Sequence, residues 1–223
     1  MRVLAIGAHP DDVEAYAGGT VARYALRGDE VFVLACTDGR MGHQVIAPEE
    51  LVPIRAREAQ AAAETMGAKL LTLGEPDGGL FVETETRRKM REVFAQVRPE
   101  VVLVHPPDDY HPDHRAASRL AEETCGLATG GGPVLLYMDT QEGLGFLPDL
   151  YVDVSGEAME RKLRALACHR SQADWLREHD GIELVEWVRG AARTRGIQCG
   201  VEYAEAFQVA KGWGLMEARR ALP

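Results

Sequence analysis

Residues 2–20 read RVLAIGAHPDDVEAYAGGT, and they join a buried strand to a cluster of polar side chains. The run 2–8 is apolar almost throughout, which is typical of a strand covered on both faces. His9, Asp11 and Asp12 follow it without a polar spacer. Adjacent carboxylates repel each other and resist burial. We therefore expect these three side chains to bind a ligand, and a cation is the ligand that would neutralise them.

Strand-like and helix-like segments alternate beyond this point. Apolar runs predict strands at 30–37, 69–74, 100–106 and 134–139, and helical patterns predict helices at 18–27, 50–66, 84–97 and 113–125. Gly18 and Gly19 are expected to mark a turn before the first of these helices. Apolar strands separated by helices indicate a parallel sheet covered on both faces. The predicted fold class is therefore α/β, a Rossmann-like three-layer αβα architecture with a mostly parallel sheet.

The last third of the chain has a less regular pattern. We expect a strand at 150–155, a helix that is capped by Ser155 and runs to about Cys168, a helix at 182–195 and a strand at 202–210. Turn-rich stretches at 74–79 and 128–133 read as loops and not as domain linkers. A chain of 223 residues can bury a full core, so residues 1–223 are predicted to form a single domain.

Composition and charge argue against several classes of protein. The net charge of −10 disfavours a nucleic-acid surface, because phosphate binding needs clustered Lys and Arg. The four cysteines are far apart, which predicts reduced thiols instead of a disulfide framework or a thiolate zinc site. No run approaches the roughly 18 apolar residues of a membrane helix, and the first residues turn acidic too soon for a signal peptide. We expect a cytoplasmic protein without nucleic-acid or membrane partners.

A second polar cluster follows the fourth predicted strand, where residues 108–114 read DDYHPDH. In an open parallel sheet, ligands bind outside the carboxyl ends of the strands, at the point where the strand order reverses. The ends of the first and fourth strands commonly flank that crevice. We therefore expect the two His/Asp clusters to face each other. His105, at the end of the fourth strand, is expected to be a packed residue.

The predicted ligand is a divalent metal ion. A dinucleotide-binding turn needs glycines after the first strand, and the carboxylates found there would repel phosphate. A mixed nitrogen and oxygen ligand set with a place for water matches catalytic zinc, and iron, manganese or cobalt could substitute for it. The rival from another class is a receiver-like signalling module that binds magnesium through an acidic pair. Such a module needs a Lys at a later strand end, whereas the fifth predicted strand here ends in YMDT.

The two motifs together resemble a known family. GAHPDDVE followed by HPDH resembles the LmbE-like, PIG-L family of metal-dependent N-acetylglucosaminyl deacetylases. Further similarities are GGT (18–20), TDG (37–39), RARE (55–58), PDGGL (76–80), HRSQ (169–172) and EYAEAF (202–207). The chain length and YAEAF look like the branch that deacetylates a glucosaminyl-malate intermediate of bacillithiol synthesis. The resemblance implies a hydrolase that removes the acetyl group from a small-molecule N-acetyl amino-sugar conjugate.

The resemblance also implies roles at the centre of the site. His9, Asp12 and His114 would be the ligands of Zn2+ or of another divalent transition metal. Asp11 would be the general base that takes a proton from the metal-bound water. Such a division of labour is coherent, because catalytic zinc usually takes three protein ligands plus water.

Five further side chains receive roles from the same resemblance. His111, held by Asp113, would be the cation that stabilises the tetrahedral oxyanion and helps to protonate the leaving amine. Arg55 and Asp77 would bind sugar hydroxyls. Tyr110 stands where the glucosaminyl-malate branch tends to carry Arg, so it is expected near the substrate or the oxyanion. This departure weakens the assignment of a malate-bearing substrate but leaves the deacetylase chemistry intact.

One alternative of the same chemistry is an amidase that acts on a non-sugar amide, which the residues alone do not distinguish from the sugar reaction. Similar proteins often assemble as trimers or hexamers. We therefore expect a homo-oligomer, with its interface in the less regular C-terminal third.

Overall fold

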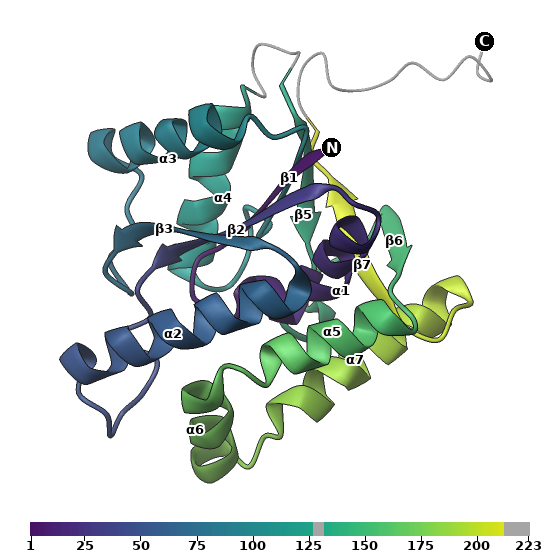
Figure 1. Ribbon diagram of the computed structural model, residues 1–223. Coiled ribbons are helices and arrows are strands. Elements are labelled where there is room, and N and C mark those ends of the chain that lie inside the picture. The colour runs from purple at the N-terminus through teal and green to yellow at the C-terminus, as the bar shows by residue number, and fades with distance from the viewer. Residues whose placement is uncertain (127–131, 212–223) are drawn as a thin grey trace.

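The computed structural model describes residues 1–126 and 132–211. Its centre is a seven-stranded sheet in the order β3-β2-β1-β4-β5-β7-β6 (Figure 1). The strands are β1 Arg2–Gly7, β2 Glu30–Thr37, β3 Lys69–Glu75, β4 Val101–Val104, β5 Val134–Met138, β6 Leu150–Asp153 and β7 Ala204–Val209. Strands β1 to β5 pair in parallel, and β7 is antiparallel to both of its neighbours. The predicted mostly parallel α/β sheet is confirmed.

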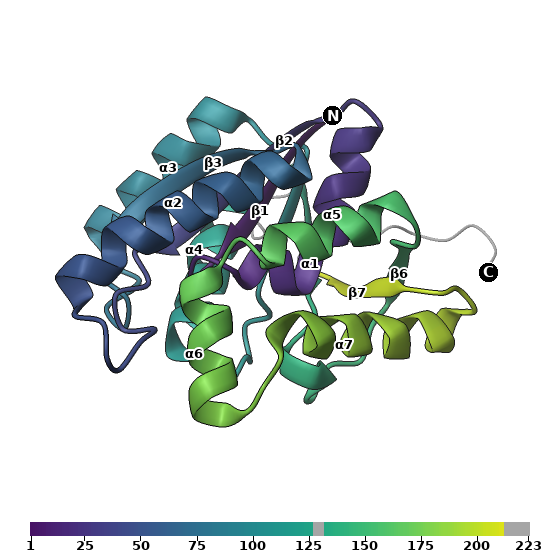
Figure 2. The same cartoon turned by 60° about the horizontal axis from the view of Figure 1, so that its bottom comes forward.

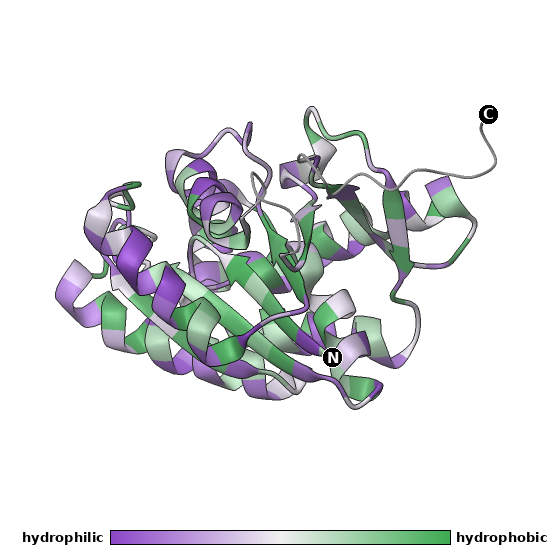
Figure 3. Cartoon of the chain, turned by 90° about the horizontal axis from the view of Figure 1, so that it is seen from above, coloured by the Kyte–Doolittle hydropathy of each residue, from purple (hydrophilic) through white to green (hydrophobic). Residues whose placement is uncertain are grey.

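Helices cover both faces of the sheet and give the molecule three layers. They are α1 Asp12–Leu26, α2 Pro48–Met66, α3 Thr84–Val97, α4 Pro112–Cys125, the short 3-10 helix η1 Gln141–Gly143, α5 Glu157–Leu166, α6 Arg170–Asp180 and α7 Leu184–Cys199. Figure 1 shows α3 and α4 on one face and α2 and α5 on the other. Leu4 and Ile6 of β1 pack in the core on the α3 and α4 side, whereas Val3 and Ala5 pack in the core formed with α1, α2 and α5. Figure 3 shows the same division, with hydrophobic central strands and hydrophilic outer faces of the helices.

The strand order reverses between β1 and β4. Strands β2 and β3 lie on one side of β1, and β4 and β5 lie on the other. β1 and β4 are paired in parallel, with Val3 opposite Val101 and Ala5 opposite Leu103. Segments that leave the carboxyl ends of these two strands therefore start next to each other. This topology confirms the prediction that the two His/Asp clusters face each other.

The turn expected at Gly18 and Gly19 is wrong, because α1 begins at Asp12 and runs through both glycines. A Cβ atom at residue 19 would lie 2.7 Å from Cβ of Val154, and one at residue 18 would lie 3.3 Å from Cγ of Lys162. The glycines thus allow α1 to pack closely against the segment that leads into α5 and against α5 itself. The pattern of apolar residues in the sequence does not predict that contact.

One further expectation fails in the C-terminal third, and one helix there was not predicted. The N-cap of α5 is Gly156 and not Ser155, whose hydroxyl oxygen accepts the backbone N–H of Tyr203 at 3.1 Å. Helix α6 was not expected at all. Gln172 is its one buried residue, and its few apolar side chains, among them Ala173 and Leu176, pack only partly buried against Leu166, Leu184 and Val188. Figure 2 shows α6 beside the ends of α5 and α7 that the chain connects, on the side of the molecule that also carries α2.

The described residues can be compared with the predictions about membrane helices and cysteines. No helix within 1–126 and 132–211 is long and apolar enough to cross a membrane. The four cysteines are free thiols, as predicted. Residues 128–131 of the predicted loop at 128–133 lie outside the described residues.

Candidate metal centre and active-site cleft

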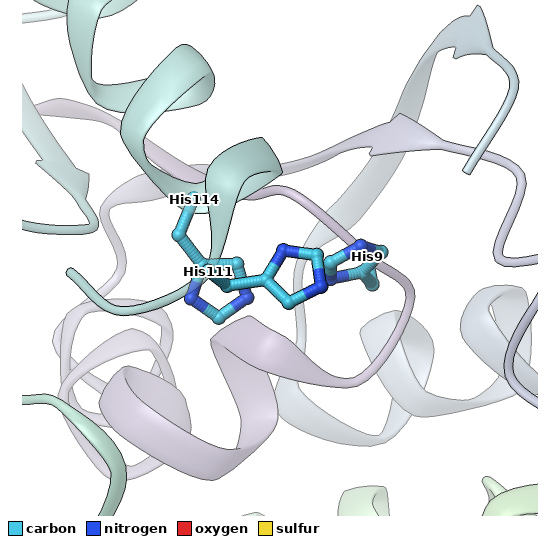
Figure 4. Close-up of side chains that lie close together, drawn as sticks. All are labelled: His9, His111 and His114. Atoms are coloured by element: carbon cyan, nitrogen blue, oxygen red, sulfur yellow. The ribbon is translucent and has the colours of Figure 1, made fainter. Parts of the chain in front are cut away.

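Two chain segments bring three imidazole rings together at the carboxyl ends of β1 and β4. His9 lies in the turn after β1, His111 is the N-cap of α4, and His114 lies in the first turn of that helix. The ring centroids are 4.7 Å apart for His9 and His111, 4.9 Å for His111 and His114, and 5.3 Å for His9 and His114. Figure 4 shows the three rings gathered where the start of α4 meets the turn after β1.

Asp12 lies between two of these rings. Its Oδ2 is 3.4 Å from Nδ1 of His9, and its Oδ1 is 3.5 Å from Nε2 of His114. Oδ2 also accepts the backbone N–H of His9 at 2.7 Å. Burial alone would raise the pKa of Asp12, but the charges of His114 and His105 outweigh burial and hold that pKa well below its usual range. Asp12 is therefore an ionised carboxylate at the centre of the cluster.

Two carboxylates face the other nitrogen of His9. Its Nε2 is 3.1 Å from Oδ1 of Asp77 and 3.3 Å from Oδ2 of Asp113. Burial lowers the pKa of His9, but the hydrogen bonds to Asp113, Asp12 and Asp77 outweigh burial and raise it to about 12. Asp77 is also fixed by the backbone N–H of Met41, which donates to its Oδ2 at 3.1 Å. With Nε2 held in this way, Nδ1 is the nitrogen that His9 presents to Asp12.

Asp109 has the same relation to His114, and no role was predicted for it although it stands inside DDYHPDH. Its Oδ1 is 3.1 Å from Nδ1 of His114 and accepts the backbone N–H of His111 at 2.9 Å. Burial lowers the pKa of His114, but the charge of Asp12 and the contact with Asp109 raise it to about 9. A carboxylate on the second nitrogen fixes the tautomer and orientation of a metal-binding histidine.

His105 is a buried residue just after β4, as expected. Its ring stacks on the ring of His114 with centroids 3.8 Å apart, and its Nε2 accepts the backbone N–H of Ala8 at 3.1 Å. The same nitrogen lies 3.1 Å from Oδ2 of Asp12. Burial and the charge of His114 both lower the pKa of His105. His105 therefore packs against the cluster through His114 and Asp12, on its buried side.

The donor atoms fit a divalent metal ion. Within residues 1–126 and 132–211, three sets have donors within 4.8 Å of one another: His9 with His111 and His114, Asp12 with His105 and His114, and His9 with Asp77 and Asp113. Among these side chains, His9 and His114 each direct one nitrogen at Asp12 and the other at a carboxylate. Two imidazoles and one carboxylate form a ligand set of catalytic zinc, which keeps a further position for water. The chemistry of the site thus agrees with a metal ion.

Asp11 lines the cleft beside the cluster. Its φ of 108° lies in the left-handed region, which costs a non-glycine residue on the order of 1–3 kcal/mol. Its Oδ2 is 3.1 Å from Nη2 of Arg55. Burial raises the pKa of Asp11, against the opposing charge of Arg55. A carboxylate with a raised pKa suits the task of a general base.

Arg55 is buried and holds the turn that carries Asp11. Its Nη1 donates to the carbonyl oxygen of Gly39 at 3.0 Å, and its Nη2 donates to the carbonyl oxygen of Pro10 and to Asp11. These acceptors come from the turns after β1 and β2, so one guanidinium joins the two turns. The predicted contact between Arg55 and a sugar hydroxyl stays a prediction.

Asp113 holds His111 in a different way from the expected one. The backbone N–H of Asp113 donates to Nδ1 of His111 at 3.2 Å, as at a helix N-cap, whereas its carboxylate contacts His9 and accepts backbone N–H groups of the turn 78–80. Burial lowers the pKa of His111, and the charges of His9 and His114 lower it further. An imidazole that accepts at Nδ1 carries its proton on Nε2. In this arrangement Nε2 of His111 is the nitrogen that can donate a proton into the cleft. The expected role of His111 as a cation stays a prediction.

A cleft of about 280 Å³ opens over the cluster. It is lined by His9, Asp11, Asp12, Tyr16, Met41, Gly42, Arg55, Asp77, Tyr110, His111, His114 and Gln172. Tyr110 stands at its mouth, with 60% of the residue exposed and its ring 6.0 Å from the ring of His111. Tyr16 of α1 and Gln172 of α6 also line the cleft and received no predicted role, although Gln172 stands in the motif HRSQ (169–172). Every predicted site residue except Asp113 thus faces the same cleft.

Replacing Asp109 by Asn should weaken the binding of a divalent metal ion by about 10–100-fold, because the carboxylate that orients His114 is lost. Competition with a chromogenic chelator would measure the affinity. Asp108→Asn is the matched control, since it removes the same charge from an exposed neighbour. Equal affinities of the two variants would contradict the orienting role of Asp109.

The mostly parallel sheet, with a His/Asp cluster at the point where its strand order reverses, places this chain in the class of metal-binding α/β proteins. The family described as PIG-L, GlcNAc-PI de-N-acetylase, matches residues 4–125. The chain belongs to this family, which confirms the resemblance seen in the sequence motifs.

Three known proteins illustrate the similarity. Diacetylchitobiose deacetylase of Thermococcus kodakarensis is 34% identical to this chain over 95% of the chain and 84% of the relative. A probable N-acetyl-alpha-D-glucosaminyl L-malate deacetylase 2 of Bacillus cereus is 33% identical over 79% of the chain and 86% of the relative. The crystal structure of 4-carboxy-2-hydroxymuconate hydratase from Pseudomonas putida superposes with a TM-score of 0.83 at 26% identity, over 98% of this chain and 100% of that one. Proteins similar to this chain therefore include deacetylases and a hydratase.

Proposed function

We propose that this protein is a metal-dependent hydrolase that removes the acetyl group from an N-acetylated amino-sugar conjugate. The observation that carries the proposal is the different placement of two adjacent carboxylates. Asp12 lies between His9 and His114, whereas Asp11 lines the cleft beside Arg55. One carboxylate is placed to bind a metal ion, and its neighbour is placed to accept a proton. The two deacetylases among the relatives supply the substrate class.

We assign the metal ligands to His9, Asp12 and His114, and Zn2+ is the metal we expect there. A divalent ion so placed polarises an amide carbonyl and lowers the pKa of water to about 7. Asp11 takes the proton of the attacking water and holds it until the leaving nitrogen takes it up. His111 donates Nε2–H to the carbonyl oxygen as negative charge develops there. The amide C–N bond breaks, and acetate and the free amine are released.

The second candidate reaction is the addition of water to a carbon–carbon double bond, because one similar structure is that of a hydratase. A carboxymuconate carries several negative charges. Among the residues that line the cleft, Arg55 is the one arginine, and it already bonds to three acceptors. A polyanion would therefore find no free guanidinium there, whereas a neutral amide needs none. Membership of the family sets aside the receiver-like module.

A substrate panel tests the proposal. Release of free amine would be assayed on N-acetylglucosamine, diacetylchitobiose, the malate and inositol conjugates of N-acetylglucosamine, and N-acetyl amino acids, with added zinc and with a chelator. We expect zinc-dependent amine release from the sugar conjugates. Release from the N-acetyl amino acids alone would favour the non-sugar amidase. A panel without metal-dependent release, combined with hydration of 4-carboxy-2-hydroxymuconate, would replace the deacetylase by the hydratase.

Tyr110→Arg is expected to shift substrate preference towards anionic conjugates. Tyr110 is exposed at the mouth of the cleft, where a guanidinium would meet a carboxylate of a malate-bearing substrate. The ratio of kcat/KM for the malate conjugate over a neutral conjugate should rise by about tenfold, which corresponds to 1.4 kcal/mol. Tyr110→Gln controls for the loss of the ring. An unchanged ratio in Tyr110→Arg would show that position 110 does not contact this part of the substrate.

We further propose a cytoplasmic homo-oligomer, a trimer or a hexamer. Large apolar side chains are exposed in and just before the edge strand β6: Leu144 (70%), Leu147 (82%), Leu150 (43%) and Tyr151 (36%). Exposed apolar residues at a sheet edge are typical of a surface that a partner covers. Light scattering after size-exclusion chromatography would give the oligomeric state, and a monomer at micromolar concentration would contradict this part of the proposal.

A further inference from the structure

The motifs GGT (18–20) and EYAEAF (202–207) meet at a buried ion pair that the reaction itself does not use. Lys162 of α5 and Glu205 of β7 are both almost completely buried. The Nζ of Lys162 is 2.5 Å from Oε1 of Glu205. Burying two charges costs free energy, and apolar residues of similar volume often serve stability as well or better. The presence of this pair therefore calls for a role other than stability.

The ion pair binds the backbone of α1. Oε1 and Oε2 of Glu205 accept the N–H groups of Gly19 and Thr20 at 2.8 Å and 2.7 Å. The Nζ of Lys162 donates to the carbonyl oxygen of Ala15 at 2.8 Å. In a regular α-helix the N–H of residue 19 bonds to the carbonyl oxygen of residue 15. Glu205 thus accepts from the N–H of Gly19, and Lys162 donates to the carbonyl oxygen of Ala15, which are the donor and the acceptor of this one helical hydrogen bond.

Glycine at residue 19 makes this contact possible. A Cβ atom there would lie 3.2 Å from Oε1 of Glu205 and 2.7 Å from Cβ of Val154. Any side chain at this position would push β7 and the segment before α5 away from the helix. The close approach of the carboxylate to the helix backbone therefore depends on the missing side chain.

The bonds continue from the ion pair to the metal-binding turn. The carbonyl oxygen of Ala15 accepts from Lys162, and the N–H of Ala15 donates to the carbonyl oxygen of Asp11 at 3.0 Å. The first turn of α1, which carries Asp12, is therefore tied to α5 and β7. We infer that Lys162 and Glu205 are positioning residues that set the place of Asp11 and Asp12 at the metal centre. This inference rests on the metal site proposed above.

The test is the zinc affinity of Glu205→Gln. Glutamine keeps the shape of glutamate but offers one acceptor oxygen, so it cannot accept both N–H groups of α1 and pair with Lys162. We expect zinc binding to weaken by about 10–100-fold, the range typical of residues that orient metal ligands. Competition with a chromogenic chelator gives the affinity. The absorption spectrum of the cobalt(II)-loaded variant should also shift, because it reports the arrangement of the ligands.

Two further variants separate positioning from stability. Met90→Ala in α3 removes a buried side chain from the core on the other face of the sheet, so it lowers the melting temperature without touching α1. The double variant Lys162→Met with Glu205→Gln leaves no unpaired buried charge. We expect unchanged zinc affinity in Met90→Ala, and weakened affinity in the double variant even where its melting temperature returns to that of the wild type.

Wild-type zinc affinity in Glu205→Gln or in the double variant would overturn the inference. An equal loss of affinity in Met90→Ala would also overturn it, because general destabilisation would then explain the effect. Failure of the wild-type protein to bind zinc would be a different result, since it would reject the proposed metal site together with everything that rests on it.

Discussion

The Asp11→Asn variant is expected to lose turnover by a factor of about 10²–10⁴ while it still binds zinc. Asparagine keeps an oxygen for the bond with Arg55 and tolerates a positive φ, so the turn should keep its shape. Its amide cannot take a proton from water, which is the task assigned to Asp11. Steady-state amine release and metal content would be measured on the same sample.

Asp29→Asn is the control for this loss. Asp29 pairs with Arg27 and the N-terminal amine, away from the cleft, so its replacement should leave turnover unchanged. If Asp11→Asn turned over as fast as the wild type, another group would have to be the base.

The His114→Ala variant should lose the metal ion itself. It removes one proposed ligand and leaves the carboxylates of Asp12 and Asp109 without the imidazole between them. Metal content after dialysis, measured by mass spectrometry, should fall from about one ion per chain to background.

His179→Ala controls for the loss of an imidazole, since His179 lies exposed on α6. Full zinc content in His114→Ala would move the metal to the donor set that lacks His114, which consists of His9, Asp77 and Asp113. The variant therefore distinguishes two arrangements of ligands in one cleft.

The main elements of the sheet were predictable because their signals are local. Apolar runs bounded by turns predicted every strand of the described chain, and the helix predicted at 50–66 ends at Met66, with Gly67 after it in the left-handed conformation. The misplaced start of α1 and the missed α6 have a common cause. In both cases the decisive contacts are made to distant segments. The glycines of α1 lie against Val154 and Lys162. In α6, Ser171 bonds to Glu58 and Gln172 bonds to Gly42.

The sequence by itself determined which residue types stand at the ends of β1 and β4, because their spacing within each motif is fixed by the chain. It also determined that the two motifs meet, because parallel strands on either side of a reversal in strand order open towards the same crevice. These two facts were enough to indicate a metal centre.

Only the tertiary structure decided which group contacts which. Asp77 and Asp113 face His9, Asp109 faces His114, and Arg55 holds the turn of Asp11 instead of standing free in the cleft. The physical reason is that a carboxylate can bond to any donor within a few ångströms, and the residue order along the chain does not specify those neighbours. They are set by the packing of strands and helices, which also brings Lys162 and Glu205 onto the backbone of α1.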